Sequence, residues 1–148
     1  MRKFTKEDKR KEAFLRAANT LFSFWRVLNQ DERDSGQSGI HSRLLEYLIE
    51  DAFVEVGESL KGRGHREHII PLTMIRDQAI KMFNQNYLVE DVAEMIEKNL
   101  KLVHITKNEQ QYLDNELGYK TSMPQGWKFG DDPFARLSKA NIKRVKTT

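Results

Sequence analysis

The first thirty residues contain an apolar stripe at helical spacing, and this stripe constrains the fold more than any other feature of the sequence. Thr5 and Asp8 have the spacing of a helix-capping pair, and the pattern that follows predicts an amphipathic helix to about Leu28. A stripe of this composition is typical of a packed core and not of a ligand site. Its members are Phe14, Ala17, Ala18, Leu21, Phe22, Trp25 and Leu28.

Length and composition describe one soluble globular domain. A chain of 148 residues can bury a core without a metal or a disulfide, and 39% hydrophobic with 32% charged residues is an ordinary composition. Cysteine is absent from the sequence, which excludes disulfides, thiolate zinc sites and a cysteine nucleophile. The N-terminus is charged, and no stretch approaches the roughly 18 apolar residues of a membrane span. We therefore expect a cytoplasmic protein without a membrane partner.

Charge is unevenly distributed along the chain. Residues 1–16 hold seven basic and three acidic residues, and residues 133–148 hold five basic and none that are acidic. The remainder, residues 17–132, holds 13 basic and 19 acidic residues. Basic ends on an acidic body are either phosphate-binding arms or solvated termini, and the acidic body argues against a broad phosphate-binding face.

Apolar spacing, glycines and prolines predict an α+β fold, a mainly helical single domain of residues 1–148 with a small two-stranded β element. Residues 1–60 are expected to form N-terminal helices, residues 61–117 to contain the strands, and residues 118–148 to form a C-terminal loop and helix. The remaining predicted elements are a polar loop at 29–39, helices at about 40–60, 72–83, 89–100 and 107–117, strands at 65–70 and 102–105, and a last helix after Asp132-Pro133.

Titratable side chains with catalytic or metal-binding potential are most concentrated around two histidines. His65 and His68 flank the carboxylate of Glu67 just ahead of an apolar pair and a proline. A neutral imidazole can activate water or bind a metal, and a neighbouring carboxylate extends both uses. We interpret His65 as a structural residue and His104, in the second strand, as a half-buried histidine with a satisfied ring. His68 remains as the candidate for chemistry.

The segment Glu67-His68-Ile69-Ile70-Pro71, followed by Asn99-Leu100 and by a helix that begins near Lys107-Asn108, resembles the pattern of HNH endonucleases. These enzymes are also described as ββα-metal or His-Me finger nucleases. The similarity covers residues 65–113, and it implies a ββα-metal-finger-like core within residues 61–117. The residues between His68 and Asn99 would then be a helical insertion in this finger.

The resemblance also implies roles for individual residues. His68 would take the proton from a water that attacks a phosphodiester, and Asn99 would orient His68 or tie the two strands together. Glu67 would bind one divalent cation together with Asn108 and Gln110, which lie where the family usually has a histidine. Oxygen and amide ligands suit Mg²⁺ or Mn²⁺ better than zinc.

Two functional hypotheses stay open at this point. The first is a metal-dependent nuclease, or a protein on the nuclease scaffold, that acts on or binds nucleic acid. The second is a non-catalytic protein-binding modulator or inhibitor, of the kind that phages direct against host or defence systems. The sequence does not distinguish them and does not indicate the oligomeric state. In the first hypothesis, phosphates are contacted by Arg63, Arg66, Lys107, Lys143 and Arg144.

Overall fold

The computed structural model describes residues 2–30 and 40–146, and within them the chain forms two compact units. The helical unit contains residues up to 53 together with residues 75–98. The sheet unit contains residues 54–74 and the residues from 99 onward. Most of the loop predicted at 29–39 lies outside the described residues.

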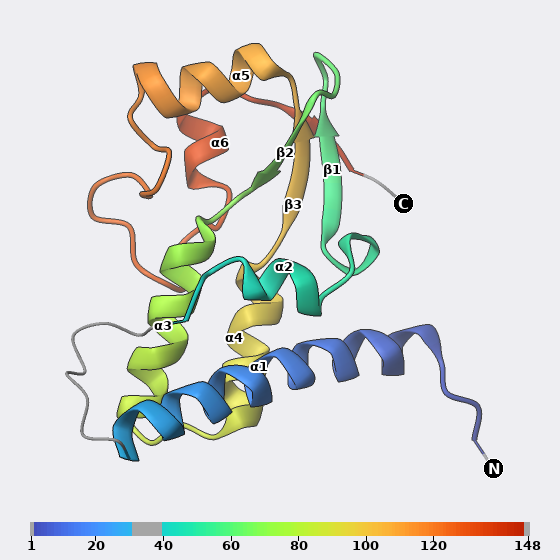
Figure 1. The fold of residues 1–148 in the computed structure, drawn as a ribbon. Helices are drawn as coiled ribbons and strands as arrows, with labels where there is room; N and C mark the ends of the chain where they lie inside the picture. Colours follow the sequence, from blue (N-terminus) through green and yellow to red (C-terminus); the bar gives the residue numbers. More distant parts are fainter. Residues whose placement is uncertain (1, 31–39, 147–148) are drawn as a thin grey trace. The chain divides into compact units, whose positions relative to one another are not determined.

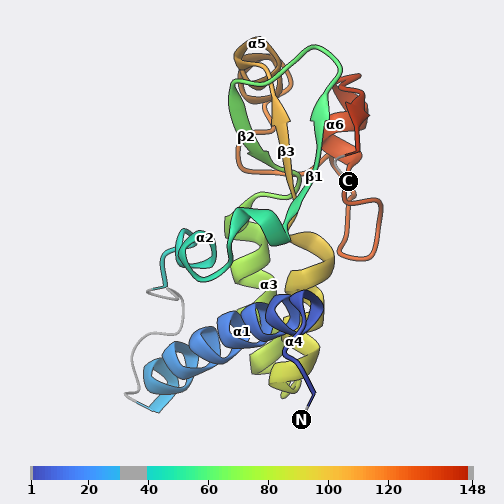
Figure 2. The ribbon, with the colours of Figure 1, turned by 90° about the vertical axis from the view of Figure 1, so that its right-hand side faces the viewer.

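The helical unit is built on the predicted N-terminal helix, which is confirmed as α1 (Lys6–Gln30). In Figures 1 and 2, α1 crosses α3 (Leu72–Asn84) and α4 (Val89–Asn99), which are also confirmed. The predicted stripe forms the contact, since the side chains of α1 from Ala13 to Leu21 include five that are at most 1% exposed. Burial of these apolar groups is the main source of stability for this unit.

Polar and aromatic contacts join α1 to the other two helices. Arg10 forms an ion pair with Glu97 of α4. Near the other end of α1, the Trp25 ring N–H donates to Asn84 Oδ1 at 2.8 Å. The ring of Phe83 lies against the aromatic pair Phe22 and Trp25, with centroid distances of 5.4 and 5.7 Å.

The prediction of one helix over residues 40–60 was wrong. In its place are a short helix α2 (Leu44–Leu48), a 3₁₀ turn η1 (Asp51–Phe53) and a strand β1 (Glu55–Ser59). The apolar spacing fits a helix, but the strand depends on close approach of a neighbouring chain segment. A Cβ built on Gly57 would lie 2.7 Å from the carbonyl oxygen of Val145, so β1 needs a glycine at this position.

The α+β class is confirmed, but the sheet is larger than the predicted two-stranded element. In the described part of the sheet unit it has four strands, in the order β2-β3-β1-β4. β3 (Leu102–Ile105) pairs antiparallel with β2 (His65–His68) and parallel with β1. β4 (Arg144–Val145) pairs antiparallel with β1. β3 therefore lies between two strands that are consecutive in the sequence, which is why local patterning did not reveal β1 or β4.

A helical stretch follows β3, as the finger resemblance implies. It comprises α5 (Lys107–Gln111) and one π-helical turn η2 (Tyr112–Glu116), and a further short helix α6 (Ala135–Lys139) confirms the last predicted helix. Thr106 and Glu109 cap the start of α5 reciprocally through side chain and backbone. None of the helices in the described residues is long and apolar enough to cross a membrane.

Candidate functional site

The resemblance assigns chemistry to two neighbouring residues of β2, and the strand directs their side chains to opposite faces of the sheet. Glu67 pairs with Val103 and His68 pairs with Leu102 across the β2–β3 ladder. Successive side chains of a strand project to opposite faces of the sheet, so Glu67 and His68 belong to different faces. His65 shares the face of Glu67 and lies on the face opposite to His68.

Glu67 lies in a buried ion pair with Arg136 of α6. The guanidinium is 1% exposed and its Nη2 lies 2.9 Å from Glu67 Oε1. The other carboxylate oxygen, Oε2, lies 2.9 Å from His65 Nε2. Arg136 also donates to the carbonyl oxygens of His68, Ile69 and Tyr119. One side chain therefore ties β2 and the segment after η2 to α6.

The environment of this pair opposes both charges. Burial raises the pKa of Glu67 above its ordinary value, and the charges of Arg136 and His65 act in the opposite direction. Burial likewise lowers the pKa of Arg136, which the charges of Glu67 and Asp114 partly offset. A guanidinium nevertheless stays protonated throughout the working pH range. Arg136 is thus a permanent buried cation that requires the Glu67 carboxylate.

The residues predicted to bind a divalent cation do not fit that role as they are arranged. Both oxygens of Glu67 already accept from, or lie against, protein nitrogen atoms. Asn108 lines a pocket to which neither Glu67 nor Gln110 contributes. Within residues 2–30 and 40–146, no group of three or more histidine, aspartate or glutamate side chains could hold a metal ion. A positive charge is supplied at Glu67 by Arg136.

The opposite face of the sheet carries His68, Arg66 and His104. Arg66 stands directly across the ladder from His104, whose Nε2 lies 2.9 Å from Glu55 Oε1 on β1. With its side chain 11% exposed and its ring partnered, His104 is the structural histidine that was expected. Asn99 is buried at the end of α4, three residues before the ladder partner of His68. The predicted pair His68 and Asn99 therefore lies near one end of β3.

The basic residues gather at the other end of the β2–β3 ladder, which is about 10 Å away along β2. The connection from β1 to β2 turns through Gly62 and Gly64, whose φ angles of 121° and 155° favour glycine. A Cβ on Gly64 would lie 3.6 Å from the backbone nitrogen of Lys107, so this turn lies against the start of α5. Figures 1 and 2 both show the two segments at the same end of the sheet.

Four lysine and arginine residues meet in this region, which we call the basic end. Lys61 and Arg63 belong to the β1–β2 turn, and Lys107 begins α5. Lys143 joins them because its carbonyl oxygen accepts from Leu60 N at 2.9 Å. All four side chains belong to exposed residues, and Arg63 lies 3.5 Å from Glu58.

Arg144, which was also predicted to contact phosphate, is held by the protein. Its Nη1 donates to the carbonyl oxygen of Val56 at 2.9 Å, and its guanidinium carbon lies 4.1 Å from the ring centroid of Phe134. The bond to Val56 joins β4 to β1, and Lys143 and Lys146 are the exposed cations on either side of Arg144. Of the predicted phosphate contacts, the structure thus brings together Arg63, Lys107 and Lys143, while Arg66 lies on β2 across from His104.

A pocket of about 480 Å³ opens within the basic end. Lys61, Asn108 and Tyr112 line it from the turn and the helical stretch, and Asn141 lines it from the segment after α6. Asn141 has a φ of 56°, and Ile142 N donates to Leu137 O at 2.9 Å, the pattern of a helix that ends in a left-handed residue. Tyr112 is 44% exposed.

Two of the residues that line the pocket, Glu109 and Ile142, are buried, and we refer to Glu109 as the floor of the pocket. Glu109, 8% exposed, accepts from Ser59 Oγ at 2.8 Å through Oε2 and from Thr106 N at 2.9 Å through Oε1. The bond to Ser59 joins α5 to the end of β1. The pocket therefore has a negative, hydrogen-bonded floor, amide and phenol groups on its walls, and lysines around it.

Sequence reasoning singled out Glu67 and Asn108 but not Arg136, Glu109 or Tyr112, which complete these two sites. Arg136 pairs with a residue 69 positions earlier in the chain, so no local pattern connects them. The usable signal was chemical: Glu67 stands in a strand beside Ile69 and Ile70, where a buried carboxylate needs a cation. For the pocket, the signal was the capping pair Thr106 and Glu109, which places Asn108 in the first turn of a helix.

Comparison with protein-family models, with curated proteins and with solved structures finds no match to this chain.

Proposed function

We propose that the chain binds nucleic acid through the basic end of its sheet unit, on a scaffold that resembles the ββα finger of HNH nucleases. The observation that carries this proposal is the convergence of Lys61, Arg63, Lys107 and Lys143 from three separate segments. Residues that are distant in sequence supply a compact cluster of exposed cations. Such a cluster attracts phosphates and releases their counterions.

The order of elements supports the scaffold. Two antiparallel strands, β2 and β3, are followed by α5, with Glu67-His68 at the end of the first strand and Asn99 ahead of the second. The ion pair between Glu67 and Arg136 supports binding over metal-assisted cleavage, because the carboxylate is already balanced by a cation of the protein itself.

Binding through the basic end predicts a specific loss when one cation is neutralised. We expect Lys107→Gln to lower the affinity for a short oligonucleotide by about 3- to 10-fold at ~0.1 M salt, and to reduce the slope of log K against log salt by about one. The measurement is fluorescence anisotropy over a series of salt concentrations.

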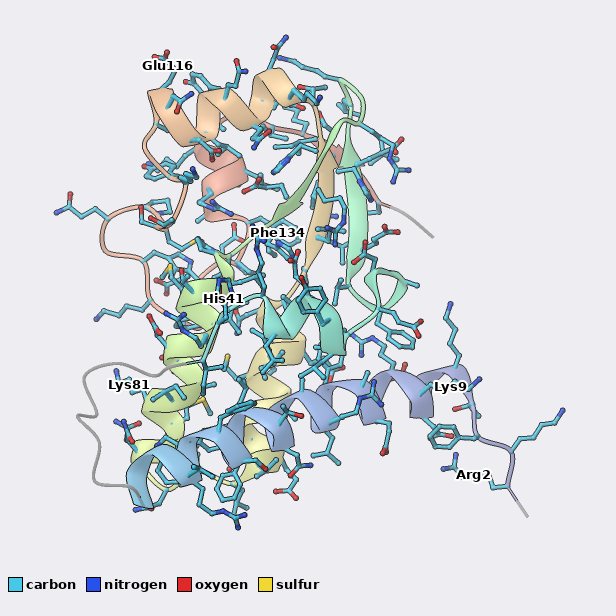
Figure 3. All side chains as sticks on the ribbon, viewed as in Figure 1. Arg2, Lys9, His41, Lys81, Glu116 and Phe134 are labelled. Carbon is cyan, nitrogen blue, oxygen red and sulfur yellow. The ribbon has the colours of Figure 1, made fainter. Side chains whose placement is uncertain are left out.

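The matched control is Lys81→Gln, which removes the same charge from an exposed position on α3 of the helical unit (Figure 3). It should leave both the affinity and the salt slope close to those of the unaltered chain. Equal losses in the two variants would mean that net charge, and not the basic end, governs binding. A chain that binds no oligonucleotide but retains a protein partner in a pull-down would support the alternative of a non-catalytic protein-binding modulator.

Hydrolysis of phosphodiesters is a second candidate function, favoured by His68 at the last position of β2 in this ββα order. It predicts cleavage of DNA or RNA in the presence of Mg²⁺ or Mn²⁺ and loss of that cleavage in His68→Ala. Product formation on a gel is the measurement. Cleavage that persists in His68→Ala would exclude His68 as the base, and cleavage that is absent in both metals would leave binding as the function.

A further inference from the structure

The pocket at the basic end differs from the surface around it in the groups that it offers. Lys61 lines it and Lys107 is next to the lining residue Asn108 in the sequence, but the lining also includes the buried acid Glu109 and the amides of Asn108 and Asn141. A phosphate is an anion and would be repelled from such a floor. A neutral group with N–H donors and acceptors suits this interior better.

Tyr112 adds an aromatic surface to the same pocket. Its side chain is 44% exposed although it lies on a helical stretch whose next residue, Leu113, is fully buried. Aromatic side chains on nucleic-acid-binding surfaces provide platforms on which unpaired bases stack, because every base has a flat π face. The ring, the two amides and the flanking lysines are therefore of the types that a nucleotide requires.

We propose that this pocket receives one unpaired base of a single-stranded nucleic acid, with Tyr112 stacked on the base and Asn108 and Asn141 bonded to its edge. Lys61 and Lys107 contact the phosphates on either side of that base. This inference rests on the proposed function, since it names the strand form that the basic end binds. The volume of about 480 Å³ is within the range of small-ligand sites.

The arrangement also gives a reason for strand selectivity. A base in a duplex is stacked and paired, so it could enter the pocket only after extrusion, which costs free energy. A single strand presents its bases without that cost. The chain should consequently bind a single strand more tightly than the duplex of the same sequence, while the lysines contribute to both.

The test is the affinity of the full chain for single-stranded and duplex oligonucleotides of about 10 nucleotides, measured by fluorescence anisotropy. Tyr112→Ala should weaken single-strand binding by about 10-fold, and Tyr112→Phe should stay within about twofold, because stacking needs the ring and not the hydroxyl. Duplex binding should change little in either variant. Circular dichroism checks that both variants fold.

A second variant removes an amide without disturbing the backbone. Asn141 occupies the left-handed region, which glycine adopts freely, so Asn141→Gly keeps the end of α6 and deletes the side chain. It should weaken single-strand binding by about threefold or more.

The outcomes separate the two proposals. Single-strand affinity that is unchanged in both Tyr112→Ala and Asn141→Gly overturns the base pocket. If Lys107→Gln still lowers the affinity for the oligonucleotide in that case, the basic end remains a phosphate-binding surface. An unaltered chain that binds neither strand form overturns the proposed function itself.

Discussion

Replacing Arg136 by methionine is expected to lower the free energy of unfolding by about 3–5 kcal/mol. Methionine keeps the length of the apolar stem but removes the charge, so the Glu67 carboxylate becomes buried without its cation. The backbone carbonyls of Ile69 and Tyr119 lose a donor at the same time. Urea unfolding followed by circular dichroism measures the change, which is a large fraction of the stability of an ordinary domain.

Two further variants identify the cause. Arg63→Met alters an exposed arginine whose ion pair with Glu58 is 3.5 Å long, and it should change the unfolding free energy by at most about 0.5 kcal/mol. The double variant Arg136→Met with Glu67→Gln should recover part of the loss, because it removes the unpaired charge but not the unpaired carbonyls. A double variant as unstable as the single one would assign the effect to the carbonyl bonds and not to the ion pair.

The same ion pair bears on the proposed resemblance to HNH nucleases, in which Glu67 would bind a metal ion. Removing one partner of a buried pair is costly, so the carboxylate of Glu67 is not readily released to another ligand. Glu67 is thus balanced by a cation that α6 supplies from outside residues 65–113, the segment that resembles the HNH pattern. The finger-like segment and the C-terminal segment are therefore stabilised by one contact.

Sequence patterning identified the elements whose evidence is local. α1, α3 and α4 follow from apolar spacing within one helix, and β3 follows from a short apolar run. β2 lies within the strand predicted at 65–70 but ends at His68, before the apolar pair. β1 was missed because its partners, Leu102 and Val145, lie more than 40 residues away, while its own apolar residues also fit a helix. Gly57 was the one local sign against a helix at this position.

The candidate site, like the fold, has one part that the sequence could predict and another part that it could not. The strand and helix predicted from the sequence place Glu67 and His68 on β2 and Asn108 on α5. The contact of Lys107 and Lys143 with phosphate stays a prediction. Alternation along the strand could have indicated that Glu67 and His68 face apart. The convergence of Lys61 and Asn141 on one pocket depends on tertiary folding, which pairwise spacing does not encode.

Glu109→Ala is expected to destabilise the chain by about 2–4 kcal/mol, since it removes the acceptor of the buried Ser59 hydroxyl and half of the reciprocal cap at Thr106. The control lies in the same helical stretch: Glu116, at its far end, is exposed (Figure 3), and Glu116→Ala should change stability by at most about 0.5 kcal/mol. Both substitutions remove one negative charge. Urea unfolding of the two variants therefore compares a buried with an exposed glutamate at equal net charge.

Glu109→Gln distinguishes the role of the carboxylate as an acceptor from its role as a charge. The amide oxygen can still accept one of the bonds from Ser59 or Thr106, so the stability of this variant should lie between those of Glu109→Ala and the unaltered chain. Neutralising the floor also removes the repulsion that keeps phosphate out of the pocket. Glu109→Gln should therefore bind inorganic phosphate more tightly than the unaltered chain does, as measured by calorimetric titration. Equal phosphate affinity in the two proteins would show that the floor charge does not select what enters.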